Sequence, residues 1–268
     1  MIKAVIFDWA GTAVDFGSLA PLRAFVKLFE SVGMVASVDA VRAAMGQNKR
    51  EHLQALLDTP KVQSQWVNLY KKAPTKKDAD RLFANFIPMN KLSIVERSEL
   101  VPGMADLVRS LAAKKIKIGA TTGYSRELME VLSPLASEQG YCPDVCICAD
   151  DVSSGRPSPQ MMLACAEFFG ISDPLSFVKV DDTLPGIEEG RNFGCWTVGV
   201  AISGNALGLS RQELEALPEQ EAERKKAMAR DKIHDMLPDF TIDTIADFLP
   251  VLEEINSRIL LKQRPGKY

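Results

Sequence analysis

The chain has 268 residues, a net charge of −3 at neutral pH and 46% hydrophobic residues, which is ordinary for a protein with a folded core. The slightly negative charge gives no reason to expect a nucleic-acid partner. No apolar run approaches the roughly 20 residues that a membrane span needs, and the N-terminal stretch lacks the features of a signal peptide. The five cysteines form no C-x-x-C pair, and the only histidines are His52 and His234. We therefore expect a cytoplasmic protein with reduced cysteines and without a disulfide framework or a zinc site.

Strands and helices are predicted to alternate from Val101 onward. Short apolar, β-branched runs predict strands, and the segments between them have helical periodicity, so we expect a parallel sheet covered on both faces. The predicted strands are Lys3–Phe7, Ile116–Thr121, Val145–Cys148, Phe177–Val180, Thr197–Val200 and Phe240–Ile242. The predicted helices are Ser125–Ser137, Pro159–Phe169, Gly186–Phe193, Thr244–Leu261 and a charged helix over Glu213–Leu237, interpreted as a solvated face.

The stretch Leu19–Lys91 has helical periodicity only, with apolar residues repeating every three to four positions. An all-helical block between the first strand and the rest of an α/β domain indicates an insertion. We therefore expect a doubly wound, Rossmann-like α/β core domain of residues 1–16 and 98–268, with an inserted all-helical cap domain of residues 17–97.

Polar residues follow four of the predicted strands, at the carboxyl ends where doubly wound sheets bind ligands. They are Asp8 after the first strand, Thr121, Thr122, Gly123 and Tyr124 after the second, Arg156 in the loop after the third, and the adjacent Asp181 and Asp182 after the fourth. Each group alone has a simpler interpretation, as a turn-capping aspartate, a polar turn or a solvated arginine. Their common position at one edge favours a shared site.

Together these groups fit phosphoryl transfer. Adjacent carboxylates repel each other unless a cation lies beside them, and carboxylate and carbonyl oxygens are the ligands that Mg²⁺ prefers. The metal and Arg156 would neutralise a phosphoryl group, while hydroxyls and amides position it for attack by Asp8. No G-x-x-x-x-G-K-[ST] loop occurs, which excludes nucleotide hydrolysis of the P-loop kind.

The order of these groups resembles the four motifs of the haloacid dehalogenase superfamily, and the helical insertion resembles its cap. Phosphatases and phosphomutases of that superfamily have a second aspartate two residues after the nucleophile, as a general acid, whereas this chain has Ala10. Alanine can offer a carbonyl to a metal but cannot donate a proton. A second acid of many members is also replaced, by Gly186; Asp181 could fill its role, and we favour Asp182 over Asp181 as the direct metal ligand.

A lysine in the helical block is a candidate for activating the leaving group. Asn48 followed by Glu51 resembles a capping box, which places Lys49 in the first turn of a helix. The positive end of the helix dipole and the neighbouring Arg50 both disfavour the ammonium form, and a neutral lysine amine forms Schiff bases with aldehydes. His52 shares the face of Lys49 and could move protons or orient the amine. From spacing alone, a solvated lysine remains the simpler alternative.

The segments FDWAGT, MGxxKxxH, TTGYxRE and GRPSP resemble the phosphonoacetaldehyde hydrolase family in particular. The resemblance implies cleavage of the carbon–phosphorus bond of phosphonoacetaldehyde to acetaldehyde and phosphate, in the degradation of 2-aminoethylphosphonate, through a lysine Schiff base and an aspartyl phosphate. It also implies a homodimer joined through the caps. The implied roles are Asp8 as nucleophile and metal ligand, Ala10 as a carbonyl ligand, Asp182 as a second carboxylate ligand, Lys49 as the Schiff-base residue with His52 and Tyr124 nearby, and Arg156 where many relatives have a lysine. Met45, Trp9 and Tyr124 could form apolar walls around the amine.

Two other functions stay open at this point. A phosphate-ester phosphatase or phosphomutase of the same superfamily is the nearest, and Ala10 argues against it. The other is a non-catalytic binding protein on this fold. Asp8, Arg156 and Asp182 together argue against that alternative, since a binding module needs no nucleophile.

Overall fold

A computed structural model describes residues 1–266 and contains one six-stranded parallel sheet. The strand order is β3-β2-β1-β4-β5-β6, and the strands are β1 (Ala4–Phe7), β2 (Lys117–Thr122), β3 (Val145–Cys148), β4 (Phe177–Asp181), β5 (Trp196–Val200) and β6 (Phe240–Ile242). Strands β2 and β3 lie on one side of β1, and strands β4, β5 and β6 lie on the other. The carboxyl ends of β1 and β4 therefore meet at the point where the strand order reverses, which is where such sheets bind ligands.

Alternate residues of β1 point to opposite faces of the sheet, and each face has its own apolar core. On one face, Val5 and Phe7 pack with the helices α6 (Met104–Ala113), α7 (Arg126–Glu138) and α12 (Phe248–Leu260). On the other, Ala4 and Ile6 pack with α8 (Gln160–Phe169) and α9 (Leu184–Phe193). The predicted α/β architecture and all six strands are confirmed, with bounds that differ by one residue or less at each end.

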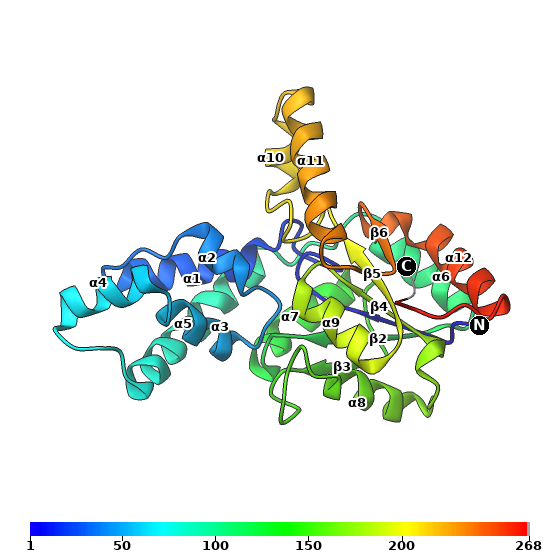
Figure 1. Ribbon diagram of the computed structural model, residues 1–268, viewed down its shortest axis with the longest axis horizontal. Coiled ribbons are helices and arrows are strands. Elements are labelled where there is room, and N and C mark those ends of the chain that lie inside the picture. The colour runs from blue at the N-terminus through cyan, green and yellow to red at the C-terminus, as the bar shows by residue number, and fades with distance from the viewer. Residues whose placement is uncertain (267–268) are drawn as a thin grey trace.

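Five helices between β1 and β2 form a block of their own, at the left of Figure 1. They are α1 (Leu19–Ser31), α2 (Val38–Ala43), α3 (Lys49–Leu57), α4 (Pro60–Tyr70) and α5 (Lys76–Glu96). Their buried faces share a separate apolar cluster that includes Phe25, Phe29 and Phe86. Two connections join this helical block to the sheet, and they run side by side: Val14 bridges Leu100, and the Asp15 amide donates to the Glu99 carbonyl over 3.0 Å.

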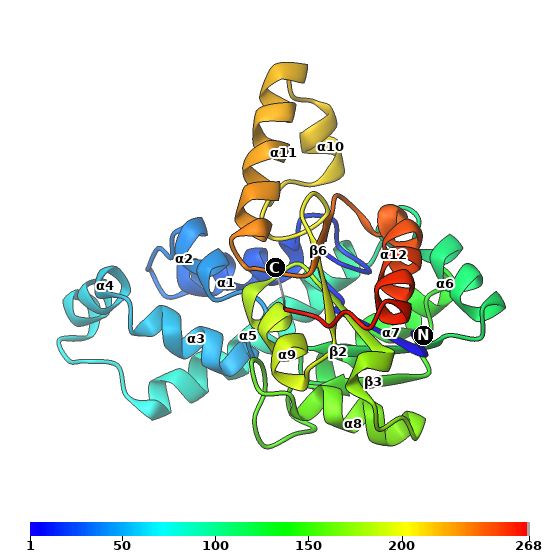
Figure 2. The same ribbon diagram turned by 45° about the vertical axis from the view of Figure 1, so that its right-hand side comes forward.

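Some predicted details are wrong. The charged stretch after Ser210 is two helices, α10 (Arg211–Glu215) and α11 (Glu219–His234), because Pro218 interrupts the run. They form a hairpin that stands away from the rest of the molecule (Figure 2). The last helix begins later than predicted, after a short 3₁₀ turn at Ile245–Asp247. Of the helices within residues 1–266, none is long and apolar enough to cross a membrane.

Candidate active site

The predicted polar residues meet at the carboxyl edge of the sheet, and Arg156 joins them. Its guanidinium pairs with Asp8 over 2.8 Å and with Asp181 over 3.3 Å, and all three side chains are buried. Burial alone would lower the pKa of Arg156, but the neighbouring carboxylates outweigh it, so the pKa is raised and the cation is stabilised. The loop before α8 thus supplies a fixed positive charge beside the Asp8 carboxylate.

Three carboxylates, from Asp8, Asp181 and Asp182, have oxygen atoms within 4.8 Å of one another. The pKa of Asp182 is raised well above its usual value, first by burial and then by the charge of Asp8. Its oxygens accept hydrogen bonds from the Thr12 hydroxyl (3.3 Å) and the Asn205 amide (2.6 Å). No lysine or arginine within residues 1–266 forms an ion pair with Asp182. The adjacent carboxylates of Asp182 and Asp8 could bind a metal ion, whose charge would stabilise the ionised form of both.

Asp181 has different surroundings. Its carboxylate contacts Arg156 and Lys179, which is 3.1 Å away, and accepts hydrogen bonds from the Thr183 amide and hydroxyl. Burial raises the pKa of Asp181, but the charges of Arg156 and Lys179 outweigh burial, and the pKa is lowered. Gly186 is required here, because a Cβ atom at that position would collide with the Asp181 carboxylate. The geometry therefore favours Asp182 over Asp181 as a direct metal ligand.

Two charged residues of this region were not expected from the sequence. Lys179 of β4 and Glu189 of α9 are fully buried, 3.2 Å apart, and Glu189 also pairs with Arg156 over 3.1 Å. The signal was present in the strand FVKVD, where a lysine interrupts a run that otherwise reads as buried. Together with Asp8, Asp181 and Asp182, Glu189 makes four buried carboxylates in this region. Two cations, Lys179 and Arg156, form ion pairs here. The excess negative charge is what a divalent cation would neutralise.

The two adjacent threonines at the end of β2 have different positions. The Thr121 hydroxyl accepts from Lys179 (2.6 Å) and Arg156 (2.9 Å) and donates to Glu189 (2.8 Å). Thr121 therefore belongs to the charged network beneath the site. Thr122 lines the cavity above it, together with Gly123, and is the threonine placed to meet a substrate.

Lys49 is the first residue of α3, as predicted, and only 5% exposed. The Asn48 side chain caps this helix by accepting from the Arg50 amide; the reciprocal bond of a capping box is not among those found in residues 1–266. The pKa of Lys49 is lowered to about 8, mainly by burial, with a further contribution from Arg156. Arg50 instead points to Asp80 on α5. The expected depression of the pKa is thus present, but its cause is burial rather than Arg50.

Lys49 and Asp8 line one small cavity between the helical block and the sheet. Its other walls come from both parts of the molecule: Ala10, Ser18, Pro21, Met45, Gly46, Thr122, Gly123, Tyr124, Arg156 and Thr183. The Lys49 amine lies 5.2 Å from the centre of the Tyr124 ring. Trp9 is not part of the wall; it is buried in the core against Tyr141. The cavity therefore brings an amine, a carboxylate and a fixed guanidinium together around one small space.

The comparisons with known proteins agree with this site. Residues 2–194 match the family model described as haloacid dehalogenase-like hydrolase. A phosphonoacetaldehyde hydrolase of Paraburkholderia phytofirmans is 43% identical over 98% of this chain and 99% of its own. One from Vibrio vulnificus is 41% identical over 98% of each chain. The chain belongs to the phosphonoacetaldehyde hydrolase family of haloacid dehalogenase-like hydrolases. It is a hydrolase, and its buried carboxylates match the use of a metal ion by this superfamily.

One solved structure supports the same family, and a second shares the fold. A phosphonoacetaldehyde hydrolase-like protein from Oleispira antarctica superposes with a TM-score of 0.96 and 38% identity, covering 98% of this hydrolase and 96% of the other chain. A β-phosphoglucomutase from Clostridium difficile has a TM-score of 0.69 and 20% identity over 97% of this chain and all of its own. The second likeness concerns the fold alone.

His52 of the hydrolase is buried one helical turn after Lys49, and its ring lies tilted against that of Phe25, with 4.2 Å between centroids. Burial, followed by the charge of Lys49, lowers the pKa of His52 to about 3. The imidazole is therefore neutral at physiological pH. This buried environment fits a residue that packs under the start of α3 and orients it. It fits a residue that exchanges protons less well.

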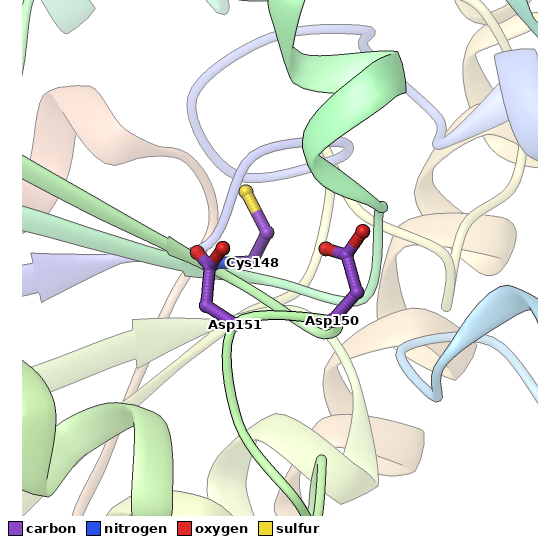
Figure 3. Close-up of side chains that lie close together, drawn as sticks. All are labelled: Cys148, Asp150 and Asp151. Carbon is purple, nitrogen blue, oxygen red and sulfur yellow. The ribbon is translucent and has the colours of Figure 1, made fainter.

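A second group of metal-ligating side chains lies at the end of β3: Cys148, Asp150 and Asp151 (Figure 3). Both carboxylates already serve the start of α7. Asp150 accepts from the Arg126 amide over 2.8 Å, and Asp151 pairs with the Arg126 guanidinium and accepts from the Cys148 amide over 2.7 Å. These bonds account for the cluster as a helix anchor, and we assign no metal to it.

Proposed function

We propose that this hydrolase cleaves the carbon–phosphorus bond of phosphonoacetaldehyde, giving acetaldehyde and phosphate. The observation that carries the proposal is the shared cavity of Lys49 and Asp8, in which the lysine amine has a pKa of about 8. A neutral amine selects for an aldehyde, and a carboxylate beside a guanidinium selects for a phosphoryl group. Phosphonoacetaldehyde carries both groups, separated by one methylene carbon.

The phosphonate would bind at the sheet end of the cavity. Arg156 neutralises one of its charges, and Thr122 with the backbone of Gly123 supplies hydrogen bonds. A magnesium ion would be held by the carboxylates of Asp8 and Asp182 and by the Ala10 carbonyl. Bound there, it would neutralise negative charge on the phosphonate and on Asp8.

The reaction would begin at Lys49, whose free amine attacks the aldehyde and loses water to give an iminium. Asp8 then attacks phosphorus, the carbon–phosphorus bond breaks, and its electron pair flows into the iminium to give an enamine. Water hydrolyses the resulting aspartyl phosphate. The enamine takes up a proton at carbon, and hydrolysis of the imine releases acetaldehyde and the lysine.

Ala10 is consistent with this sequence of steps. An oxygen leaving group would need a proton from a general acid at that position, as in ester phosphatases. The leaving carbon here is stabilised by the iminium on Lys49, so no acid is needed. The same residue argues against a phosphatase or phosphomutase.

The helical block, residues 17–97, would be the cap domain, and residues 1–16 with 98–268 the catalytic core. Closure of the cap would bring Lys49 to Asp8. We also propose a cytoplasmic enzyme of 2-aminoethylphosphonate degradation that forms a homodimer through its caps. The aromatic residues Phe25 and Phe29 of α1 are fully buried and cannot supply this contact. Exposed apolar residues such as Leu92 and Val95 of α5 are better placed.

Borohydride trapping tests the mechanism. Purified protein with phosphonoacetaldehyde and Mg²⁺ should release phosphate and acetaldehyde, and borohydride added during turnover should fix the substrate carbons on Lys49. Removal of the metal with EDTA should abolish release, and Lys49→Arg should lose both activity and trapping. The matched control is Lys91→Arg, at a half-buried lysine of α5 paired with Glu127, which should change neither.

Other outcomes would support a different function. Near-normal turnover by Lys49→Arg, or label on another residue, would exclude the Schiff base. Rapid hydrolysis of sugar phosphates would indicate an ester phosphatase, and binding without turnover a non-catalytic protein.

A further inference from the structure

Arg42 of α2 reaches from the helical block to the loop after β5. Its Nη1 atom donates to the Asn205 side-chain oxygen over 2.8 Å and to the Gly17 carbonyl over 3.3 Å, and Nη2 donates to the Gly208 carbonyl over 2.9 Å. In return, the Asn205 side-chain amide donates to the Arg42 carbonyl over 3.2 Å. One arginine and one asparagine therefore form a two-way connection between parts of the chain 163 residues apart.

The core loop is shaped to receive the guanidinium. Gly208 has a φ of +69°, and a Cβ atom there would lie 2.6 Å from the Arg42 Cζ, so a side chain at this position would displace the arginine. Burial lowers the pKa of Arg42, and the charge of Asp182 is the strongest influence opposing that shift. The guanidinium is thus held near the carboxylates, although it forms no ion pair with them.

Asn205 also contacts the proposed metal ligand directly. While its side chain bonds Arg42, its backbone amide donates to the Asp182 carboxylate over 2.6 Å. Gly204 packs so closely that a Cβ atom there would collide with the Asp182 Cβ. Movement of this loop would therefore change the position of Asp182.

We propose that Arg42 and Asn205 form a latch that holds the helical block closed over the cavity and couples closure to the orientation of Asp182. The inference rests on the proposed function, since it assigns the block as a closing cap. When the cap opens, the Arg42 bonds break and the loop loses its anchor. Asp182 is then held less firmly. Closure therefore brings Lys49 to the cavity and fixes the position of Asp182 in the same movement. Both residues are positioning residues, because neither lines the cavity.

Arg42→Ala, Arg42→Lys, Asn205→Ala and the double alanine variant test the latch. A lysine keeps the charge, but its single ammonium nitrogen cannot reach all three oxygens that the Arg42 guanidinium contacts. We expect each single variant to lose about tenfold to a hundredfold in kcat/KM, the range of hydrogen bonds to a charged group. The double alanine variant should lose no more than the worse single one, because both remove the same connection.

Two readouts distinguish a latch from a structural contact. Small-angle scattering should show a larger radius of gyration for the variants than for the unmodified protein. The Kd for Mn²⁺, measured on the same proteins by calorimetry, should rise about tenfold, as expected when support of a metal ligand is lost. The control is Arg81→Ala, an exposed arginine of α5 near Asp78, which should match the unmodified protein in all three measurements.

Specific results would overturn the latch. The first is a folded Arg42→Ala variant whose radius of gyration and Kd for Mn²⁺ equal those of the unmodified protein. The second is a double variant whose loss in kcat/KM is the product of the losses in Arg42→Ala and Asn205→Ala. Failure of the proposed function would look different: the unmodified protein would not turn over phosphonoacetaldehyde, while scattering and Mn²⁺ binding would still report on the latch.

Discussion

Lys49 lies where a charged side chain is costly, and this makes its amine reactive. Burial lowers its pKa from 10.5 to about 8, and Arg156 acts in the same direction, while Asp8 and Asp182 oppose the shift. At pH 7 roughly a tenth of such an amine is unprotonated, against less than about a thousandth at the ordinary pKa. The position of one residue thus changes the amount of nucleophile by a factor of hundreds.

The pH dependence of turnover should follow this group. Because Lys49 must lose its proton to attack the aldehyde, kcat/KM for phosphonoacetaldehyde should rise with pH and level off above about 8. A lysine in water would place the rise near 10.5. Initial rates between pH 5.5 and 10 measure it, and a limb still rising at pH 10 would contradict the buried-amine assignment.

The buried pair of Lys179 and Glu189 supports Arg156 from beneath. Lys179→Met leaves Glu189 and Asp181 without one of their cations, so we expect a loss of about 3–5 kcal/mol in the free energy of unfolding. Urea unfolding measures this loss. Lys179→Met combined with Glu189→Leu should be more stable than Lys179→Met alone, and additive losses would show that the two side chains are not coupled.

At the scale of elements, α3 shows how one helix serves two purposes. Its buried face carries Lys49 and His52 with Leu53, Leu56 and Leu57, while Arg50 lies on the outer face. Residues three to four apart share a face of a helix, so the apolar side chains that fix α3 in its block also fix the direction of Lys49. His52 belongs to this packing through its contact with Phe25.

His52 should make the protein sensitive to acid. The pKa of His52 is about 3 in the folded state against its ordinary value of 6.5, so the unfolded chain binds the extra proton between these values. Stability is therefore complete above pH 6.5 and falls with pH towards 3. From pH 7.5 to pH 5 this group alone should remove about 2 kcal/mol from the free energy of unfolding.

His52→Leu is the variant that tests this effect, because it removes the titratable imidazole and fills the site with an apolar side chain of similar size. Urea unfolding at pH 7.5, 6 and 5 should show a shallower pH dependence for His52→Leu than for the unmodified protein. Equal slopes over that range would mean that other groups cause the acid sensitivity.

At the scale of the whole molecule, the active cavity exists only where two packed bodies meet. The loop of Gly46 and Gln47 presses against the core so closely that a Cβ atom at Gly123 would collide with the Gln47 carbonyl, and one at Gly46 with Thr183. Glycine at these contacts lets the two backbones approach and encloses the cavity.

Gly123→Ala should push the helical block away from the core. Gly123 does not have a positive φ, so alanine adds no backbone strain, and its methyl group meets the backbone of Gly46 and Gln47. We expect a folded protein with a larger radius of gyration and kcat/KM reduced about tenfold or more, since a small misplacement of reacting groups is costly. Gly155→Ala, whose Cβ would have an ordinary 3.8 Å contact with Asn48, is the comparison. Equal activity of Gly123→Ala and the unmodified protein would show that the closed contact is not required for turnover.

Much of this protein was determined by the sequence alone. The alternation of β-branched runs and helical segments predicts the parallel sheet, and the carboxyl ends of parallel strands necessarily meet at one edge. Asp8, Arg156 and Asp182 could therefore be placed together without coordinates. Lys49 was placed at a helix start by Asn48, because a side-chain cap depends only on near neighbours.

The tertiary structure decided the features that depend on distant contacts. Only packing shows that Asp181 pairs with two cations while Asp182 forms no ion pair among residues 1–266. Packing alone also shows that Thr121 lies below the cavity and Thr122 in it, and that burial rather than Arg50 lowers the pKa of Lys49. Residues adjacent in sequence point to opposite sides of a strand, so their partners come from elsewhere in the chain. For the same reason the Arg42–Asn205 connection, which spans 163 residues, could not be found from local spacing.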